Sequence, residues 1–305
     1  MGTPDFAVHS LSALREAGHD ICGVFTREDK PKGRGMKVFP TPVKEYALSH
    51  EIPVFTPKKL RDGTALALIE TLAPELIAVT AYGRLLPKEI LDYPKFGCIN
   101  VHASLLPKYR GSAPINWSIV KGEAETGITI MYMAEELDAG DMIFTRSTPI
   151  SQTDDAVSLW NRMGPMGAAL LVEAVAAIAA GTAVRVPQKH ADMTLAPMLG
   201  REHASLDFSK TAQELHNQVR GLVPWPATTA TLAGRTLKVF RSRVSDRHSE
   251  LAAGSIVQAD KQGLLVACGD NSVLELVEIQ GEGGKRMEAK AYLLGKPFHL
   301  EDIGT

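Results

Sequence analysis

The chain has 305 residues, which is long enough to bury a sizeable core and to form two domains. Hydrophobic residues make up 45% of it and charged residues 22%, the composition of an ordinary soluble globular protein. The formal net charge of −2 indicates no class of partner, and the three cysteines and nine histidines lack the spacing of a disulfide framework or a metal site, so we expect a reducing cytoplasm.

The amino-terminal residues predict a turn followed by a helix. Thr3 can cap the helix, Pro4 suits its first position, and Asp5 faces the positive end of its dipole. In an α/β fold such a glycine-led turn normally follows a buried strand, but only Met1 precedes it here. We therefore expect that the first strand of the sheet is missing and that residues upstream of Met1 supply it. The alternative is that Met1 is the true start and that the helix begins the fold.

Short apolar runs then alternate with helical patterns. Strands are predicted at 20–25, 52–55, 75–80 and 98–101, and helices at 42–50 and 63–71. This alternation predicts an α/β fold with a Rossmann-like parallel sheet and helices on both faces. Ligands of such sheets bind beyond the carboxyl ends of the strands, so the residues that follow each strand are the first candidates for a site.

A basic segment, 27–44, lies between the first two of these strands. It has only two acidic residues, Glu28 and Asp29, and its glycines and prolines disfavour both helix and strand. We expect a mobile loop, which is either a solvated surface or a contact for a polyanionic partner, because lysine and arginine neutralise phosphates. Its basic residues are Arg27, Lys30, Lys32, Arg34, Lys37 and Lys44.

The segment 98–114, CINVHASLLPKYRGSAP, changes from an apolar strand to a polar loop. Asn100 and His102 are two residues apart, so on a strand their side chains leave the sheet on the same face. An amide N–H and a protonated imidazole are both hydrogen-bond donors, which suits a reaction in which a carbonyl oxygen gains negative charge. The alternative is a turn-capping asparagine beside a half-buried histidine.

A later turn supplies a carboxylate. Asp138 and Asp141 flank an Ala-Gly pair, which is a turn signal between strands predicted at 127–133 and 142–150. A carboxylate there could hold or exchange the imidazole proton of His102, as general acid–base catalysis requires. The alternative is an Asx turn without chemistry.

The second half of the chain follows a long predicted helix, 154–180, whose longest apolar run is too short to span a bilayer. We expect domains at 1–186 and 206–305, joined by a linker at 187–205. Five short strands in the last domain predict a small barrel of the oligonucleotide-binding (OB) type, at 228–232, 236–242, 254–258, 263–267 and 273–279. Seven lysines and arginines against three acidic residues between 205 and 247 are compatible with nucleic acid, although solvated strands are the commoner case.

Six motifs stand out: GTPDFA at 2–7, KGRG at 32–35, INVHASLLPKYRGSAP at 99–114, ETGITIM at 125–131, LDAGDM at 137–142 and PWP at 224–226. Together they resemble the methionyl-tRNA formyltransferase family, and the resemblance covers essentially the whole chain. N-x-H-x-S-L-L-P followed by L-D-x-G-D is characteristic of the 10-formyltetrahydrofolate-dependent transformylases. The basic loop, the PWP segment and the carboxyl-terminal barrel favour this branch among them.

The resemblance implies transfer of a formyl group from 10-formyltetrahydrofolate to the α-amine of methionyl initiator tRNA, by a cytoplasmic monomer without metal or membrane. Asn100 and His102 would contact the formyl oxygen. Asp138 would order the imidazole and a water that relays protons. The tRNA would contact the basic loop and, further along, the barrel. The residues implied at the folate site are Ser104, Leu105, Leu106 and Pro107, and those implied at the tRNA are Lys32, Arg34 and Lys37.

Two other functions stay open. The same chemistry could act on a small amine, such as an amino sugar nucleotide or glycinamide ribotide. A non-catalytic nucleic-acid-binding module would explain the basic segments, but it would leave Asn100, His102 and Asp138 without a purpose. The chain departs from the family in its first strand and at 195–198, where LAPM stands in place of the usual tyrosine and lysine, so that segment is assigned no role.

Overall fold

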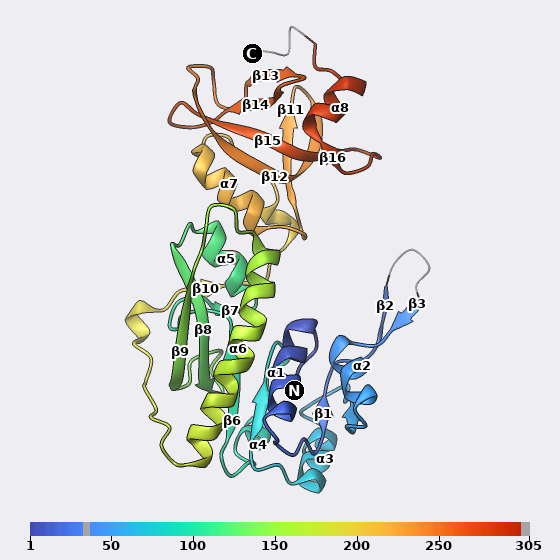
Figure 1. The fold of residues 1–305 in the computed structure, drawn as a ribbon, viewed down its shortest axis with the longest axis vertical. Coiled ribbons are helices and arrows are strands. Elements are labelled where there is room, and N and C mark those ends of the chain that lie inside the picture. Colours follow the sequence, from blue (N-terminus) through green and yellow to red (C-terminus); the bar gives the residue numbers. More distant parts are fainter. Residues whose placement is uncertain (33–36, 300–305) are drawn as a thin grey trace. The chain divides into compact units, whose positions relative to one another are not determined.

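The computed structural model describes residues 1–32 and 37–299, and the chain divides into two compact units. The first unit comprises Met1–Pro114, Glu125–Pro149 and Trp160–Pro197, and the second comprises Ile115–Ala124, Ile150–Leu159 and Met198–Thr305. Figure 1 shows strands and helices mixed in the blue to green part of the chain and a β-rich orange to red part. The predicted α/β portion and β-rich portion are therefore both confirmed.

Six strands of the first unit form a two-stranded sheet and a four-stranded sheet. They are β1 (Val24–Phe25), β4 (Val54–Phe55), β5 (Ile77–Val79), β6 (Cys98–His102), β8 (Glu125–Tyr132) and β9 (Met142–Pro149). β1 pairs with β4 and β5 with β6, both in parallel, as predicted. β8 and β9 extend the order to β5-β6-β8-β9 and are antiparallel to their neighbours, so this sheet is mixed.

The helices of the first unit connect these strands. They are α1 (Asp5–Glu16), α2 (Pro42–Ser49), α3 (Thr64–Leu72), α4 (Lys88–Leu91) and α6 (Ala156–Ala179), whose first residues belong to the second unit. Thr41 caps α2 by accepting a hydrogen bond from the Lys44 amide at 3.1 Å. The prediction that Thr3 caps α1 is wrong, because its hydroxyl instead donates to the Tyr82 carbonyl at 3.2 Å and no side chain caps that helix.

Met1 and Gly2 lie between β1 and β5 and hydrogen-bond to both. Gly2 N–H donates to the Phe25 carbonyl at 3.0 Å, and Thr80 N–H donates to the Met1 carbonyl at 2.9 Å. Beyond this junction lies a pocket of about 530 Å³, lined by residues before and within β1, by β5 and by apolar side chains of α1, α3 and α6. We call this pocket the strand slot. A strand ahead of Met1 stays a prediction.

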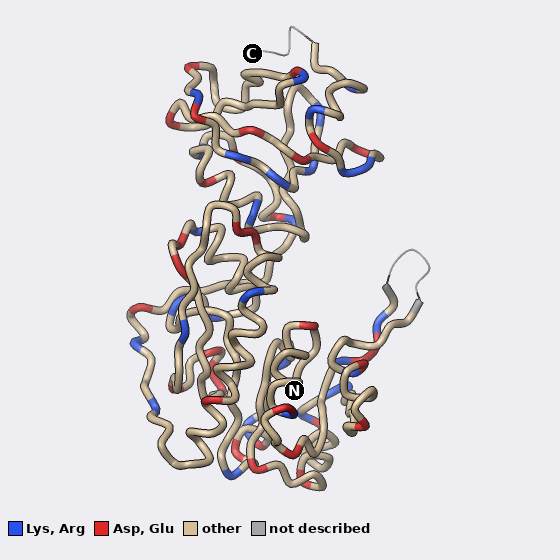
Figure 2. Tube along the Cα trace, in the orientation of Figure 1, with Lys and Arg blue, Asp and Glu red and all other residues tan. Residues whose placement is uncertain are grey.

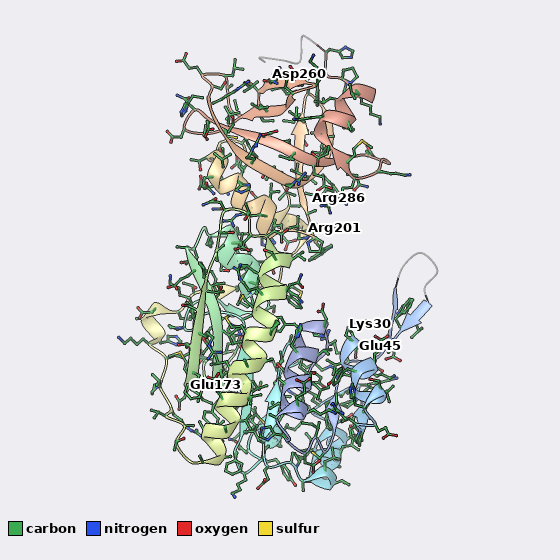
Figure 3. The ribbon with its side chains drawn as sticks, viewed as in Figure 1. Lys30, Glu45, Glu173, Arg201, Asp260 and Arg286 are labelled. Atoms are coloured by element: carbon green, nitrogen blue, oxygen red, sulfur yellow. The ribbon has the colours of Figure 1, made fainter. Side chains whose placement is uncertain are left out.

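α6 packs on the central sheet. A Cβ added at Gly167 would lie 2.9 Å from Cγ1 of Val101 on β6, so the helix approaches the strand closely at this point. Glu173, labelled in Figure 3, accepts from the Arg146 guanidinium of β9 at 3.0 Å through both carboxylate oxygens. By length and composition alone the 24 residues of α6 could cross a membrane, but buried core helices pass the same test.

The basic segment contains regular structure where a loop was predicted. β2 (Lys30–Lys32) and β3 (Lys37–Phe39) pair in an antiparallel ladder, with Pro31 opposite Val38. The prediction that proline and glycine exclude strands here is therefore wrong for 30–32 and 37–39. Arg34 lies outside the described residues. Cross-strand pairing overrides local propensity because it satisfies backbone groups that a single strand leaves open.

The second unit is built on one antiparallel sheet. Its strands are β11 (Thr228–Leu232), β12 (Arg235–His248), β13 (Ile256–Asp260), β14 (Gly263–Ala267), β15 (Ser272–Gly281) and β16 (Met287–Glu288). The order is β11-β12-β15-β14-β13, and β16 adds to β15. Within the described part of the chain no ladder joins β11 to β13, so the sheet is not closed into a barrel.

The second unit also contains α7 (Ala212–Gly221), α8 (Ala289–Gly295) and, from its second residue, α5 (Pro114–Val120). α7 begins with a capping box, in which Thr211 and Glu214 each accept a hydrogen bond from the other's backbone. Leu215 and Val219 of α7 share a buried apolar cluster with Leu237 of β12 and Leu276 of β15. The apolar face of α7 therefore covers the sheet.

Candidate active site

β6 positions the two residues that open the candidate site. Asn100 lies opposite Val79 of β5, and His102 lies opposite Thr129 of β8. Because side chains alternate along a strand, Asn100 and His102 leave the same face at the carboxyl end of β6. Asn100 is half-buried, and its side chain makes no hydrogen bond to any residue that the structure describes. Its amide is therefore available to a ligand.

The imidazole of His102 is only 5% exposed, and its two nitrogens face different partners. Nε2 lies 2.9 Å from the carbonyl oxygen of Tyr109. A carbonyl can only accept, so Nε2 carries a proton and donates it there. Nδ1 lies 3.7 Å from Oδ2 of Asp138, which is too long for a hydrogen bond. Nδ1 is thus the nitrogen that can exchange a proton with a reacting group, with a carboxylate beside it.

Asp138 is held in an unusual backbone conformation. Its φ of 50° lies in the left-handed region, which aspartate tolerates better than most residues and which is frequent at functional sites. Its Oδ2 accepts a hydrogen bond from the Gly111 amide at 2.8 Å, and its side chain is 13% exposed. Gly140 in the same turn lies against the Tyr132 carbonyl, where an added Cβ would collide with the backbone. The turn therefore presents the carboxylate in one defined position.

The loop that follows β6 is fastened to β8. Thr129 is fully buried; its hydroxyl donates to the Ser104 carbonyl at 2.7 Å and accepts from the Leu106 amide at 3.1 Å. The Ser104 hydroxyl donates a hydrogen bond to the Lys108 carbonyl at 2.6 Å, so its proton is already used within the loop. Ser104 and Leu106 are buried, whereas Leu105 and Pro107 are half-buried. The latter two are the better placed of the four predicted folate residues to meet a ligand.

Three residues that hold this site together were not singled out from the sequence. They are Thr129, the 3% exposed Arg110, and Gln188, which bonds to both Arg110 and the turn of Asp138. Thr129 and Arg110 lie in motifs that carry the family resemblance, so their positions held a signal. Gln188 had none, because it falls in the predicted linker.

Three buried side-chain atoms have no hydrogen-bond partner in the described part of the chain: the Tyr82 hydroxyl, Nε of Arg27 and Oδ1 of Asp29. Arg27 follows β1 and Tyr82 follows β5, so both lie beyond the carboxyl ends of strands. Burial raises the pKa of Tyr82, while the charges of Arg84 and Arg27 act in the opposite direction.

The predicted tRNA residues of the basic segment are only partly described. Lys32 and Lys37 face each other as backbone partners at the end of the β2–β3 hairpin, and their side chains lie outside the described structure. Lys30, labelled in Figure 3, is exposed at the start of that hairpin. Lys44 is neutralised by Asp29 at 2.7 Å. Figure 2 shows the blue positions of the hairpin with red ones at its base.

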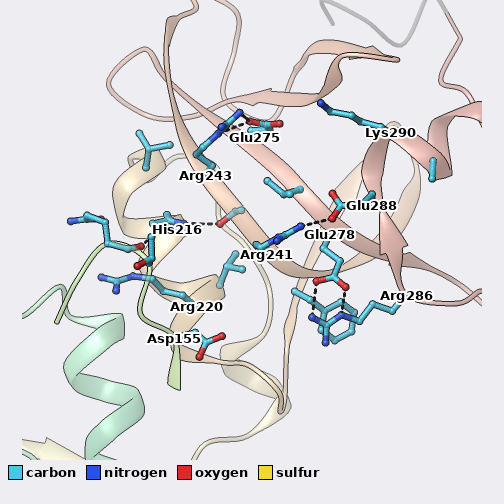
Figure 4. Close-up of a pocket in the computed structure, with 18 of the residues that line it drawn as sticks. Asp155, His216, Arg220, Arg241, Arg243, Glu275, Glu278, Arg286, Glu288 and Lys290 are labelled. Carbon is cyan, nitrogen blue, oxygen red and sulfur yellow. Dashed lines mark hydrogen bonds and ion pairs between the residues drawn. The ribbon is translucent and has the colours of Figure 1, made fainter. Parts of the chain in front are cut away.

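The second unit contains a larger pocket of about 1170 Å³, between α7, β12, β15 and α8 (Figure 4). Its arginines are mostly paired: Arg241 with Glu288, Arg243 with Glu275 and Arg286 with Glu278. Of the seven lysines and arginines between 205 and 247, two, Arg241 and Arg243, are therefore neutralised by carboxylates of β16 and β15. Lys261 and Lys290 line the pocket without an ion pair in the described part of the chain.

No cluster of three or more metal-ligating side chains occurs among residues 1–32 and 37–299. His102 faces a single carboxylate, Asp138. The imidazole of His102 and the carboxylate of Asp138 can transfer a proton, and the amide of Asn100 can donate a hydrogen bond.

Comparison with known proteins gives consistent matches over the chain. The formyl transferase family matches residues 1–175, and the formyl transferase C-terminal domain matches 198–297. The methionyl-tRNA formyltransferase of Alkaliphilus oremlandii is 47% identical over 303 residues, 99% of this chain and 97% of that protein. That of Bacillus subtilis is 45% identical over 303 residues, 99% and 96% of the two chains.

A solved structure gives the same fold. An N-formyltransferase from Helicobacter canadensis, in complex with folinic acid and dTDP-3-aminofucose, superimposes with a TM-score of 0.68 at 19% identity, over 90% of this chain and 96% of that chain. At this identity the likeness concerns the fold.

Proposed function

The chain belongs to the methionyl-tRNA formyltransferase family, and from this we infer that it transfers a formyl group from 10-formyltetrahydrofolate to the α-amine of methionyl initiator tRNA. The observation that carries this function is the 47% identity to a methionyl-tRNA formyltransferase over 99% of the chain. The product is the formylmethionyl-tRNA used in translation initiation. Amino sugar nucleotides and glycinamide ribotide are not favoured as acceptors, because the chain is 45–47% identical to methionyl-tRNA formyltransferases over nearly its whole length.

The reaction exchanges one bond for another. The amine nitrogen of the methionyl group attacks the formyl carbon, the new C–N bond forms, and the bond from that carbon to N10 of the folate breaks. The formyl oxygen carries negative charge in between. The amine loses one proton and N10 gains one, so the reaction needs a proton path and an oxyanion donor but no oxidant.

We assign these tasks to three residues. The amide of Asn100 donates a hydrogen bond to the formyl oxygen. One such donor lowers the activation free energy by roughly 3 kcal/mol. His102 takes the amine proton at Nδ1, because Nε2 is occupied by the Tyr109 carbonyl. Asp138, at 3.7 Å, stabilises the imidazolium that forms. These assignments are supported by the position of Asn100 and His102 at the end of β6, where the turn between β8 and β9 brings Asp138 beside His102.

The two substrates bind on either side of this centre. Leu105 and Pro107 would meet the folate, supported by Thr129 beneath the loop. Lys32, Arg34 and Lys37 would meet the acceptor end of the tRNA. What supports this assignment is the basic composition of the segment, since lysine and arginine neutralise phosphates.

The two parts of the chain are assigned different tasks. We assign formyl transfer to residues 1–186 and tRNA binding to an OB-like domain at 206–305, with 187–205 between them. The second unit's small antiparallel sheet supports the OB-like assignment. We propose that the enzyme acts in the cytoplasm as a monomer.

A transfer assay tests the function. The purified protein is incubated with 10-formyltetrahydrofolate and, in separate reactions, with methionyl initiator tRNA, glycinamide ribotide or a free amino sugar. We expect formylation of the tRNA at least about 100-fold faster than of either small amine. Equal or faster formylation of a small amine would contradict the assignment.

A further inference from the structure

The residues that follow α6 are part of the site. We call 186–196 the return segment, because it runs back over two loops of the first unit. Val186 and Met142 exchange both backbone hydrogen bonds at 2.9 Å. β10 (Leu195–Ala196) then pairs in parallel with β7 (Arg110–Gly111). The return segment thus joins the loop after β6 to the turn between β8 and β9.

Gln188 makes this connection with one side chain. Its Nε2 donates to the Asp138 carbonyl and to the Gly140 carbonyl, both at 2.8 Å. Its Oε1 accepts from Nε and Nη2 of Arg110, at 3.0 and 2.8 Å. An amide offers two donors and two acceptor positions, so every hydrogen-bonding position of Gln188 is used.

The buried guanidinium of Arg110 stabilises the position of Gln188. The guanidinium is 3% exposed, and a buried charge needs hydrogen-bond partners to offset its lost hydration. Within the described part of the chain, its other side-chain partner is Glu136, at 3.2 Å, whose side chain is 64% exposed. Gln188 is therefore the partner that solvent competes with least.

The same turn is held from the other side. Gly111, next to Arg110, donates its amide to Oδ2 of Asp138 at 2.8 Å. The backbone carbonyl of Asp138 is fixed by Gln188 and its carboxylate by Gly111, so its left-handed conformation is set at both ends. These bonds place Oδ2 3.7 Å from Nδ1 of His102.

We propose that Gln188 is a positioning residue for formyl transfer: through its bonds to Arg110, Asp138 and Gly140 it sets the Asp138 carboxylate against the His102 imidazole. This inference rests on the proposed function. The segment assigned to a linker thereby becomes part of the catalytic unit. A carboxylate moved by about 1 Å costs on the order of 100-fold in rate, so a residue that fixes it has a measurable effect.

Two substitutions separate positioning from the support of Arg110. Gln188→Leu removes all four bonds. Gln188→Glu keeps an oxygen that can accept from Arg110. Its second carboxylate oxygen replaces the NH₂ group, so the two hydrogen bonds donated to the Asp138 and Gly140 carbonyls are lost and an acceptor faces them instead. If Gln188 serves only to satisfy Arg110, Gln188→Glu restores the enzyme. If it positions Asp138, both variants stay defective. Lys189→Met, at the exposed neighbouring residue, is the matched control.

The test measures kcat and KM for both substrates, together with the ring ¹H–¹³C NMR signal of His102 in the protein without substrates. We expect both Gln188 variants to lose about 10- to 100-fold in kcat, with KM changed less than threefold, and to shift the His102 signal. Lys189→Met should match the wild type in all of these. Wild-type kcat or an unmoved His102 signal in Gln188→Glu would overturn the proposal.

The NMR signal separates this proposal from the function itself. A wild type that fails to formylate methionyl-tRNA contradicts the proposed function, whatever Gln188 does. A shifted His102 signal in both Gln188 variants still supports positioning in that case. Circular dichroism melts establish that the variants are folded, so that kcat is compared per folded molecule.

Discussion

Nδ1 of His102 lies 3.7 Å from Oδ2 of Asp138, while Nε2 of the same ring donates to the Tyr109 carbonyl. The imidazole is therefore fixed in orientation by a backbone group and faces its carboxylate with the other nitrogen. This arrangement assigns proton exchange to Nδ1 and leaves the oxyanion to Asn100.

Asp138→Asn should lower kcat by at least about 100-fold, because the amide retains an acceptor for the Gly111 amide but loses the negative charge that faces the imidazole. Affinity for tRNA should change less than twofold in a filter-binding assay. Asp141→Asn, in the same turn, is the matched control and should stay near wild type. Equal losses in the two variants would remove the special role of Asp138.

The basic hairpin should act through charge on the tRNA. Lys32→Ala, Arg34→Ala and Lys37→Ala should each raise KM for methionyl initiator tRNA and reduce the slope of log K against log salt by about 1, with kcat at saturation unchanged. Lys58→Ala is the control, since its exposed ammonium lies 4.0 Å from Glu28 outside the hairpin. An unchanged salt slope in the hairpin variants would dissociate this segment from tRNA binding.

The strand slot should accept one additional β-strand between β1 and β5. An apolar extension of five alternating valines and isoleucines, fused ahead of Met1, would continue the hydrogen bonds that Met1 and Gly2 make to β1 and β5. Each fully buried aliphatic side chain contributes roughly 1.5–3 kcal/mol, so the melting temperature should rise by more than about 5 °C. A glycine-serine extension of equal length is the control. No difference between the two extensions would show that the slot takes no strand.

The second unit should lose stability in mild acid through His216. Burial lowers the pKa of its imidazole; a hydrogen bond to the Gln152 carbonyl raises it, and the charge of Arg220 lowers it. The folded state thus binds fewer protons than the unfolded state, so this contribution is complete above the ordinary histidine pKa of about 6.5 and is lost as the pH falls through the lower folded pKa.

Melting curves between about pH 7.5 and about pH 5 check this effect, because this range brackets the ordinary histidine pKa of about 6.5. His216→Asn should melt with a shallower pH dependence than the wild type over that window. The Ser242 hydroxyl, 3.0 Å from Nδ1, gives the control Ser242→Ala, which keeps the imidazole. Parallel curves for His216→Asn and wild type would exclude the histidine as the source.

The central features of the site could be predicted from local patterns. Asn100 and His102 share a face because strand alternation has a fixed period, and Asp138 was found from a turn signal between two strands. Strands β11 and β14 were predicted with their observed ends, since glycine and polar turns bound them.

Other features depend on partners that are distant in the sequence. Gln188 connects to Arg110 and Asp138 only in the folded chain, so no spacing or motif indicates it. β2 and β3 contain residues of low strand propensity that pair with each other. β12 extends through Arg235–His248, beyond its predicted end at 242, because register shifts let it bend along β15.

The most direct test is single-turnover formylation of methionyl initiator tRNA by the wild type, Asn100→Ala and His102→Ala, with enzyme in excess and both substrates saturating. The account predicts that each substitution lowers the transfer rate by about 100- to 1000-fold while tRNA binding stays within twofold of the wild type. A His102→Ala enzyme that transfers the formyl group at a near-normal rate would contradict the account.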